Sequence, residues 1–217
     1  NIGSVAQSAI AGGRSNSNQA ACSFIGGGQS NTICSGEIFS TIGGGCKNIA
    51  DADYSTIAGG RQNNTCGFGG TIAGGLCNKQ AGNYSFVGGG LCNTASAACS
   101  VAVGGQRNQA TGAVTSILGG QLNTASATFS TILGGECNII SNATASCGGN
   151  SFIGVGFCNQ IIGCTHANII VGGTKNMISG SLSGSNTNIT SGGCDNFIGG
   201  GFSNCIIPVN KWGKYNT

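Results

Sequence analysis

Apolar residues recur along this chain at a fixed interval, and that interval defines a repeat. In the unit that begins Ser40-Thr41-Ile42-Gly43-Gly44-Gly45, the third residue is apolar and the ninth, Asn48, is asparagine. From Ser40 to Ser130 such units follow one another every fifteen residues. The same frame starts at Ser8, Ser23, Ser40, Ser55, Gly70, Ser85, Ser100, Thr115 and Ser130, and less regularly at Ser151, Asn168, Gly180 and Asn196. Self-similarity of this kind is the signature of a repeat protein.

Two positions of the unit predict the interior. The third is apolar and the ninth is Asn in all thirteen units, Leu182 and Asn188 of the Gly180 unit included. When units stack, the apolar column becomes a core and the Asn column becomes a ladder whose amides bond neighbours above and below. We therefore expect a core ladder of Ile25, Ile42, Ile57, Ile72, Val87, Ile117 and Ile132, with Asn31, Asn48, Asn63, Asn78, Asn93, Asn108 and Asn123.

Each unit predicts two short strands and two corners. The segment around the third residue alternates with period two, and a second strand starts at Asn with a small apolar residue two positions later, as in Asn93-Thr94-Ala95. Glycine pairs such as Gly59-Gly60 supply the positive φ of a tight corner. The fold class is therefore all-β, a parallel β-solenoid of about 13 rungs with a fifteen-residue repeat and a length of roughly 60 Å. Residues 1–205 form one domain, and 206–217 a C-terminal cap or junction.

The register slips in a few places, which predict loops at one corner. Two extra residues fall between Ser23 and Ser40, and six between Ser130 and Ser151. The unit from Asn168 is short if the next one starts at Gly180. Solenoids tolerate such insertions at a corner and often place binding contacts there.

Composition supports a thin structure and argues against several functions. There are 43 Gly, and charged and aromatic residues make up 6% each, which cannot fill a wide core. A net charge of +3 without a basic run predicts no nucleic-acid partner, and no apolar stretch approaches the roughly 18 residues of a membrane span. Five acidic residues and a single His166 offer no catalytic motif, so we expect no enzyme, no cofactor and no metal site. Cys164 near His166 is the one hint of a metal ligand pair, and a loop histidine explains it better.

The outward positions of the first strand are not polar in the usual way. The residue after the inward one is small or apolar, as at Ala58 and Leu118. The residue before it is often Thr or Phe, at Phe24, Thr41, Thr56, Thr71, Phe86, Thr131 and Phe152. A long strip of this kind usually has a partner. We expect either packing against another chain or binding of an external surface such as ice. Aromatics just before the strand (Phe39, Tyr54, Tyr84 and Phe129) predict a packing column rather than a platform for bases.

Thirteen cysteines point to an oxidising compartment. Cys77 and Cys92 share the eighth position of consecutive units, as do Cys137 and Cys158, so each pair falls within the Cα window of a disulfide; buried thiols are the alternative. Asn142, in the inserted loop, is a candidate glycosylation site. The chain begins at Asn1 rather than Met, from which we expect a processed product or an excerpt.

The half-repeats resemble a known family. Stretches such as Asn83-Tyr84-Ser85-Phe86-Val87-Gly88-Gly89-Gly90 and Asn93-Thr94-Ala95-Ser96-Ala97 are similar to the head repeats of trimeric autotransporter adhesins and of fibre proteins of phages and large viruses. That resemblance implies a left-handed β-roll, three parallel chains and attachment to a host or surface receptor. The half-repeat also resembles the units of a plant ice-binding β-roll.

These observations favour a non-enzymatic structural or adhesive fibre module on the exterior of a cell or virion, self-associating as a homotrimer or filament. The alternative is an ice-binding monomer with a face of Thr and small residues, against which Phe at several outward positions counts. An enzyme acting on polysaccharides is the weakest hypothesis, because such enzymes need wider coils and acidic clusters.

Overall fold

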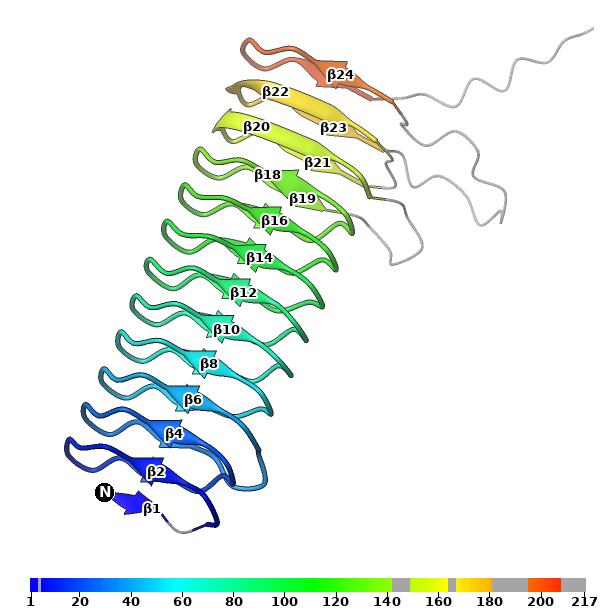
Figure 1. Cartoon of the computed structure of the whole chain (residues 1–217). Helices are drawn as coiled ribbons and strands as arrows, with labels where there is room; N and C mark the ends of the chain where they lie inside the picture. Colours follow the sequence, from blue (N-terminus) through cyan, green and yellow to red (C-terminus); the bar gives the residue numbers. More distant parts are fainter. Residues whose placement is uncertain (4, 142–148, 164–166, 181–194, 208–217) are drawn as a thin grey trace, which may run out of the picture.

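The computed structural model describes residues 1–3, 5–141, 149–163, 167–180 and 195–207, which form one rod of stacked coils (Figure 1). Odd-numbered strands make a 13-stranded sheet, here sheet A, and even-numbered strands a 12-stranded sheet, here sheet B. Every strand pair is parallel. The predicted parallel β-solenoid with a fifteen-residue repeat is confirmed.

Most strands are two residues long, because corners follow almost at once. Sheet A contains β1 Ile2–Gly3, β3 Ser17–Asn18, β5 Thr32–Ile33, β7 Ile49–Ala50, β9 Asn64–Thr65, β11 Lys79–Gln80, β13 Thr94–Ala95, β15 Gln109–Ala110, β17 Thr124–Ala125, β19 Ile139–Ser141, β21 Gln160–Ile162, β23 Met177–Ser179 and β25 Cys205–Ile206. Sheet B contains β2 Ala9–Ile10, β4 Phe24–Ile25, β6 Thr41–Ile42, β8 Thr56–Ile57, β10 Thr71–Ile72, β12 Phe86–Val87, β14 Val101–Ala102, β16 Ser116–Ile117, β18 Thr131–Ile132, β20 Phe152–Phe157, β22 Ile169–Thr174 and β24 Phe197–Ile198.

The apolar column lies between the two sheets, in register. Ile42 pairs with Ile57, and Ile57 with Ile72. The third-position residues of the predicted core ladder (Ile25, Ile42, Ile57, Ile72, Val87, Ile117 and Ile132) have no exposed surface. The interior is thus one methyl-rich layer thick, which suits a chain with few large side chains.

The Asn ladder bonds mainly to the backbone rather than from amide to amide. Asn63 donates its side-chain amide to the carbonyls of Gly59 and Gly75, both at 3.0 Å, and its backbone N–H to Oδ1 of Asn48 at 3.0 Å. The same pattern recurs through the ladder residues Asn31, Asn48, Asn78, Asn93, Asn108 and Asn123. Each Asn therefore closes its own corner and ties it to the coils on either side.

Positive φ occurs at three places in a regular coil, of which the sequence reading identified one. The second Gly of each pair has it, as at Gly60 (φ 86°), whose Cβ would lie 2.3 Å from the Gly75 carbonyl oxygen. The residue before Asn has it too, as at Gln62 (φ 56°). So does the residue before the sheet B strand, as at Tyr54 (φ 55°). Both corners thus place ordinary side chains in the left-handed region, pointing out of the rod.

The unit predicted from Gly180 is not a coil of the stack. Strand β22 pairs directly with β24, matching Ile170 to Ile198, and β23 pairs with β25. The next coil after Asn168 therefore begins at Asn196, and the expected short unit does not exist. Leu182 and Asn188 lie outside the described residues, and so do residues 208–217.

An extra half-coil precedes the first predicted unit. Strand β1 pairs with β3, and Asn16 donates its backbone N–H to Oδ1 of Asn1 at 3.1 Å. Asn1 thus takes the ninth position of the repeat, one coil below Asn16 in the Asn ladder.

Candidate functional site

The outer face of sheet B is formed by the residues immediately before and after each inward third-position residue. The second-position residues are Ala9, Phe24, Thr41, Thr56, Thr71, Phe86, Val101, Ser116, Thr131, Phe152, Ile169 and Phe197. The fourth-position residues are Ala11, Gly26, Gly43, Ala58, Ala73, Gly88, Val103, Leu118, Leu133, Gly154, Val171 and Gly199. Charged side chains do not occur at these positions. The strip is uncharged and mostly apolar over the length of the twelve strands.

Phenylalanine at the second position always stands with glycine at the fourth. The pairs are Phe24/Gly26, Phe86/Gly88, Phe152/Gly154 and Phe197/Gly199. A Cβ added to these glycines would lie 3.3 to 3.6 Å from Cε1 of the ring. Each ring therefore lies beside the glycine two residues on, and for Gly26, Gly88 and Gly154 the atom nearest to an added Cβ is a backbone carbonyl oxygen of the next coil. At Leu118 the fourth position is large and the second, Ser116, is small, whereas Ile169 and Val171 are large at both positions of one coil.

The predicted surface residues all belong to this face. Phe24 is 42% exposed, and Thr41, Thr56, Thr71, Phe86, Thr131 and Phe152 are half-buried. Thr41, Thr56 and Thr71 stack in direct register on consecutive strands. Phe197, at the second position, is the most exposed apolar side chain of the face, and the fourth position adds Val103, Leu118, Leu133 and Val171. The set of surface residues predicted from the sequence was drawn from the second position and left these four out.

The outer face of sheet A is different in kind. Its tenth- and twelfth-position residues include Lys79, Gln109, Asp51, Ser96 and Thr111, interspersed with apolar ones. The two broad faces of the rod are therefore unlike each other, one uncharged and mostly apolar, the other mixed and polar.

The disulfide candidates are free thiols that lie next to each other. Cys77 and Cys92 occupy the same place in consecutive coils, with φ of 57° and 56°, and the same holds for Cys137 and Cys158. Burial raises the pKa of Cys77, with Cys92 adding to the shift; Cys158 has the same effect on the pKa of Cys137. A disulfide is not formed by either pair in the structure.

Acidic and thiol groups meet at the second corner of the early coils. Desolvation raises the pKa of Cys34 to about 11, assisted by its hydrogen bond to Asp51. Desolvation likewise raises the pKa of Glu37, and the neighbouring Asp53 carboxylate raises it further. Asp53 also accepts the backbone N–H of Ile38 at 2.7 Å. This carboxylate thus has a structural role, and the group offers no nucleophile–base pair.

The aromatic residues at the second corner form a packed column, as expected for Phe39, Tyr54 and Tyr84. Ring centroids are 5.2 Å apart for Phe39–Tyr54, 5.2 Å for Tyr54–Phe68 and 5.4 Å for Phe68–Tyr84. Phe68 was missed because it stands one position early. It fits because Gly69, where a Cβ would approach the Tyr84 ring to 2.9 Å, leaves room. Phe129 lies exposed on a later coil.

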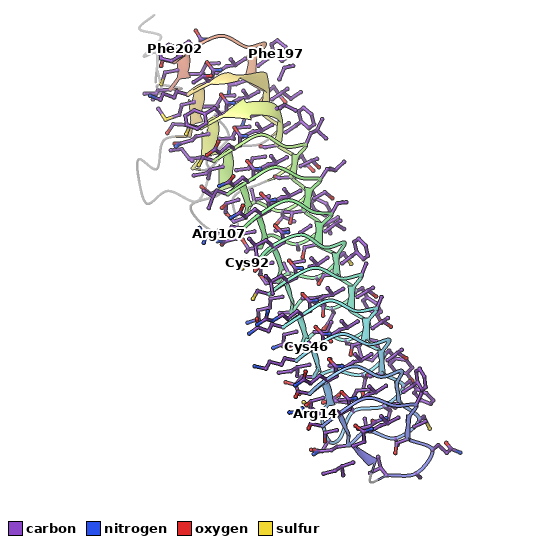
Figure 2. The ribbon with its side chains drawn as sticks, turned by 90° about the vertical axis from the view of Figure 1, so that its left-hand side faces the viewer. Arg14, Cys46, Cys92, Arg107, Phe197 and Phe202 are labelled. Carbon is purple, nitrogen blue, oxygen red and sulfur yellow. The ribbon has the colours of Figure 1, made fainter. Side chains whose placement is uncertain are left out.

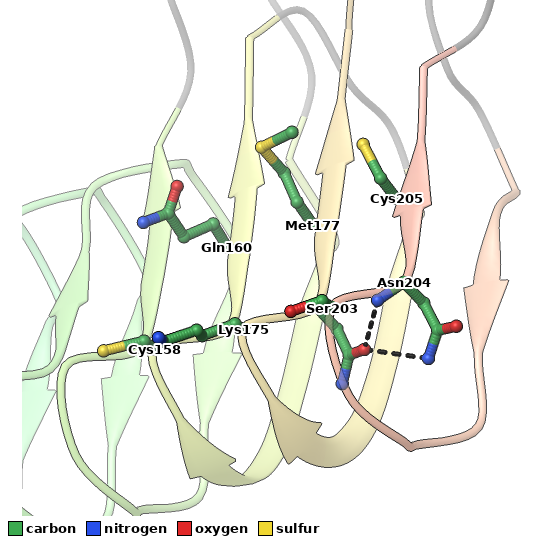
Figure 3. A pocket seen from close by; sticks show the side chains of 8 residues that line it. Cys158, Gln160, Lys175, Met177, Ser203, Asn204 and Cys205 are labelled. Carbon is green, nitrogen blue, oxygen red and sulfur yellow. Dashed lines mark hydrogen bonds between the residues drawn. The ribbon is translucent and has the colours of Figure 1, made fainter.

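One depression of about 470 Å³ lies at the C-terminal end of sheet A (Figure 3). Its lining includes Cys158, Gln160, Lys175, Met177 and Cys205, and it is open to solvent. The described residues contain no group of three His, Cys, Asp or Glu side chains able to hold a metal ion. Cys164, His166 and Asn142 lie outside these residues. A helix long and apolar enough to cross a membrane is not found in the described part of the chain.

Comparison with protein families found no family model that matches the chain, and comparison with curated proteins found no match.

Proposed function

We propose that this chain is a non-enzymatic structural or adhesive fibre module that self-associates through the outer face of sheet B. The observation that carries the proposal is the uninterrupted uncharged strip along twelve strands, in which each Phe lies beside a glycine. A partner surface lying along the whole rod accounts for a face that apolar and uncharged side chains line from end to end.

The strip has the area of a small interface, below the roughly 800 Å² that each partner buries in a standard one. Twelve strands at about 4.8 Å spacing and a width of three residues give a face about 55 Å by about 10 Å. That is at the upper end of the apolar patches that monomers expose, about 300–600 Å². A second copy presents the same coil spacing, so side chains of the two strips match along their full length. No other partner is guaranteed that periodicity.

A second candidate function rests on the stacked threonines. Thr41, Thr56 and Thr71 form a short regular array beside Gly43, Ala58 and Ala73, which is the kind of flat hydroxyl–methyl surface that binds ice. Phe24 and Phe86 bound this array on both sides. The Thr array is therefore three coils long, and self-association remains the first proposal.

A role outside the cell, on a cell or virion surface, accompanies this proposal. In an oxidising compartment Cys77 would bond Cys92, and Cys137 would bond Cys158, since coils about 4.8 Å apart bring their Cα atoms within disulfide range. Peptide mapping after mild oxidation tests both bonds. Recovery of the four cysteines as reduced peptides after exposure to oxidised glutathione would count against them.

The test of self-association is the native mass by light scattering, under reducing and non-reducing conditions. We expect a multiple of 21.2 kDa for the native chain. The double variant Val103→Lys/Leu118→Lys places two charges on the apolar strip and should give a folded monomer. Its control, Gln109→Lys/Ser126→Lys, places the same charges on the opposite face of the same coils and should keep the native mass.

A monomeric native chain would overturn the proposal. Shaping of ice crystals by that monomer, lost in Thr56→Leu, would establish the second function instead. Loss of association in both double variants, with circular dichroism unchanged, would also refute the assignment to sheet B, because it would show that charge alone controls association.

A further inference from the structure

Two pairs of thiols are stacked at the corner that follows sheet B, here the first corner. Cys77 and Cys92 occupy the eighth position of consecutive coils, and so do Cys137 and Cys158. Cys92 donates its backbone N–H to the Leu76 carbonyl at 2.8 Å, and Cys158 makes the corresponding bond at 2.9 Å. All four cysteines have a φ of 56° or 57°. The two Cα–Cβ bonds of each pair are therefore parallel, and both thiols leave the rod in the same direction.

The spacing of the coils sets the distance between the two sulfur atoms of a pair. Parallel side chains in one rotamer repeat at the coil spacing of about 4.8 Å. A disulfide of about 2.05 Å requires both side chains to turn toward each other. Bonds from thiolate sulfur to first-row metal ions are about 2.3 Å long, and two of them in a line span about the coil spacing. The stacked thiols are therefore spaced to hold one ion between them without a change of rotamer.

A basic residue follows each thiol pair on the next coil. Arg107 lies one coil above Cys92, and Lys175 lies one coil above Cys158; each donates its backbone N–H to the carbonyl that precedes the cysteine, at 2.8 Å. Figure 2 shows Cys92 and Arg107 one after the other along the same side of the rod. In Figure 3 the Lys175 side chain extends toward Cys158. The order of two thiols and then a cation thus occurs twice at the same position of the repeat.

The first corner also carries most of the positive charge of the described residues. Arg14, Lys47 and Arg61 lie there too, whereas Glu37, Asp51 and Asp53 lie toward the second corner. Burial and the neighbouring Cys92 raise the pKa of Cys77, and the Arg61 guanidinium opposes the rise. The thiol of Cys77 is exposed and the other three are half-buried, so an ion from solution reaches both pairs.

We propose that each thiol pair, Cys77 with Cys92 and Cys137 with Cys158, binds one Cu(I) ion in linear two-coordinate geometry. Soft thiolate ligands select Cu(I), whereas structural Zn(II) takes four ligands, and the described residues contain no group of even three. The expectation of no metal site was based on zinc-like ligand spacings, which a two-thiol Cu(I) site does not need.

The charge balance of the reaction explains the adjacent cation. Binding forms two copper–sulfur bonds and releases two protons, one from each thiol, so each neutral site gains one negative charge. Arg107 and Lys175 offset that charge. Oxidation of a pair to a disulfide uses the same sulfur atoms, so Cu(I) binding belongs to the reduced chain. The proposal does not depend on self-association, because the first corner lies outside the sheet B strip.

The test is an anaerobic titration of the fully reduced chain with Cu(I), in competition with a chromogenic Cu(I) chelator. Cys92→Ser and Cys158→Ser should each bind one ion fewer than the native chain, and the double variant two fewer. The side chains point out of the rod, so circular dichroism should be unchanged. Cys46→Ser is the matched control, because Cys46 lies on the same side of the rod between Gln29 and Arg61, and it should bind like the native chain.

Two further readouts examine the geometry and the cation. X-ray absorption at the copper edge should show two sulfur neighbours for each ion. In Cys158→Ser, which keeps only the first pair, the additional change Arg107→Gln should weaken Cu(I) binding about threefold to tenfold, because a positive charge beside the site is lost. Lys47→Gln removes the same charge from the same corner, beside Ser30 and Gln62, and should leave the affinity unchanged.

Three results would overturn the inference. Equal uptake of Cu(I) by the native chain and by Cys92→Ser/Cys158→Ser would show that other groups bind the metal. Three sulfur neighbours for each ion would exclude the linear two-thiol site. Equal weakening by Arg107→Gln and Lys47→Gln would show that net charge, rather than the residue above the pair, controls the affinity.

Discussion

Two irregular residues of the repeat, Gly70 and Gln80, compensate each other, and reverting them one at a time should be costly. Gly70 stands where the other regular coils have Ser or Thr, and Gln80 is buried where they mostly have Ala or Ile. A Cβ on Gly70 would lie 2.0 Å from Cδ and Oε1 of Gln80. The Gln80 amide accepts the Gly67 N–H at 3.3 Å and donates to Ser85 Oγ at 2.8 Å and to the Gly82 carbonyl.

The magnitude follows from what each change leaves behind. Gly70→Ser forces the fully buried Gln80 amide out of place, which combines overpacking with unpaired polar groups and should cost about 2–5 kcal/mol. Gln80→Ala leaves a cavity and unpaired Gly67 and Gly82 groups, about 2–4 kcal/mol. The double variant restores the regular pattern, in which the hydroxyl introduced at position 70 would donate to the Gly67 carbonyl as Ser100 does to Ala97 at 2.7 Å. It should be within about 1 kcal/mol of the native chain, a coupling of about 3 kcal/mol.

The assay is urea unfolding followed by circular dichroism for the native chain, both single variants and the double variant. Denaturant slopes have to agree across the four proteins, because a solenoid can unfold in parts. If the two costs simply add, so that the double variant is the least stable of the four, the steric explanation of this pair is wrong.

Three further predictions concern single sites. Gly59→Ala should leave the free energy of unfolding unchanged or raise it by up to about 1 kcal/mol, since nothing lies within 4 Å of the new Cβ. Gly60→Ala should lower it by several kcal/mol, because Gly60 has a φ of 86° and its new Cβ would meet the Gly75 carbonyl. Equal melting temperatures of the two variants would contradict this. Thr65→Val should raise the free energy of unfolding by about 1 kcal/mol, because the buried Thr65 hydroxyl has no hydrogen-bond partner, and a lower unfolding midpoint would show that it has one. Alkylation by iodoacetamide at pH 8, followed by mass spectrometry, should be slow at Cys34, whose pKa is about 11. It should be faster in Asp51→Asn, because this change lowers the pKa of Cys34. The exposed Cys99 is the internal control, and an unchanged rate at Cys34 would exclude Asp51 as a cause of its raised pKa.

Much of the fold was predictable because the same apolar, glycine and asparagine positions recur in each unit of the repeat. An apolar residue at the third position of every described coil indicates which side chains point inward, and the structure agrees. The Gly180 unit was misread because Leu182 and Asn188 fit the pattern by spacing, while strand pairing, which a sequence does not state, joins Ile170 to Ile198.

The surface was less predictable, for a different reason. In the sequence, Phe86 and Gly88 are two separate departures from the most frequent residues of the repeat. The structure connects them, because the Phe86 ring lies beside Gly88. The separation of Lys47 from Asp51 likewise depends on which corner each residue reaches. The position of a residue in the repeat determines the corner that it reaches. The separation of charges can therefore be read from the sequence when charged residues are sorted by repeat position rather than counted.

The direction of the hydrogen bonds has a mechanical consequence. Strands cross the long axis of the rod, so bonds between coils, such as Asn78 N–H to Asn63 Oδ1 at 3.0 Å, point along it. A pull along the axis therefore loads the bonds of one interval at a time, and the rod should yield coil by coil in small steps, like a zipper. A sideways load is shared by many coils at once. A fibre made of this chain would be weak in tension and stiff in bending unless neighbouring copies or bonds between coils carry the axial force.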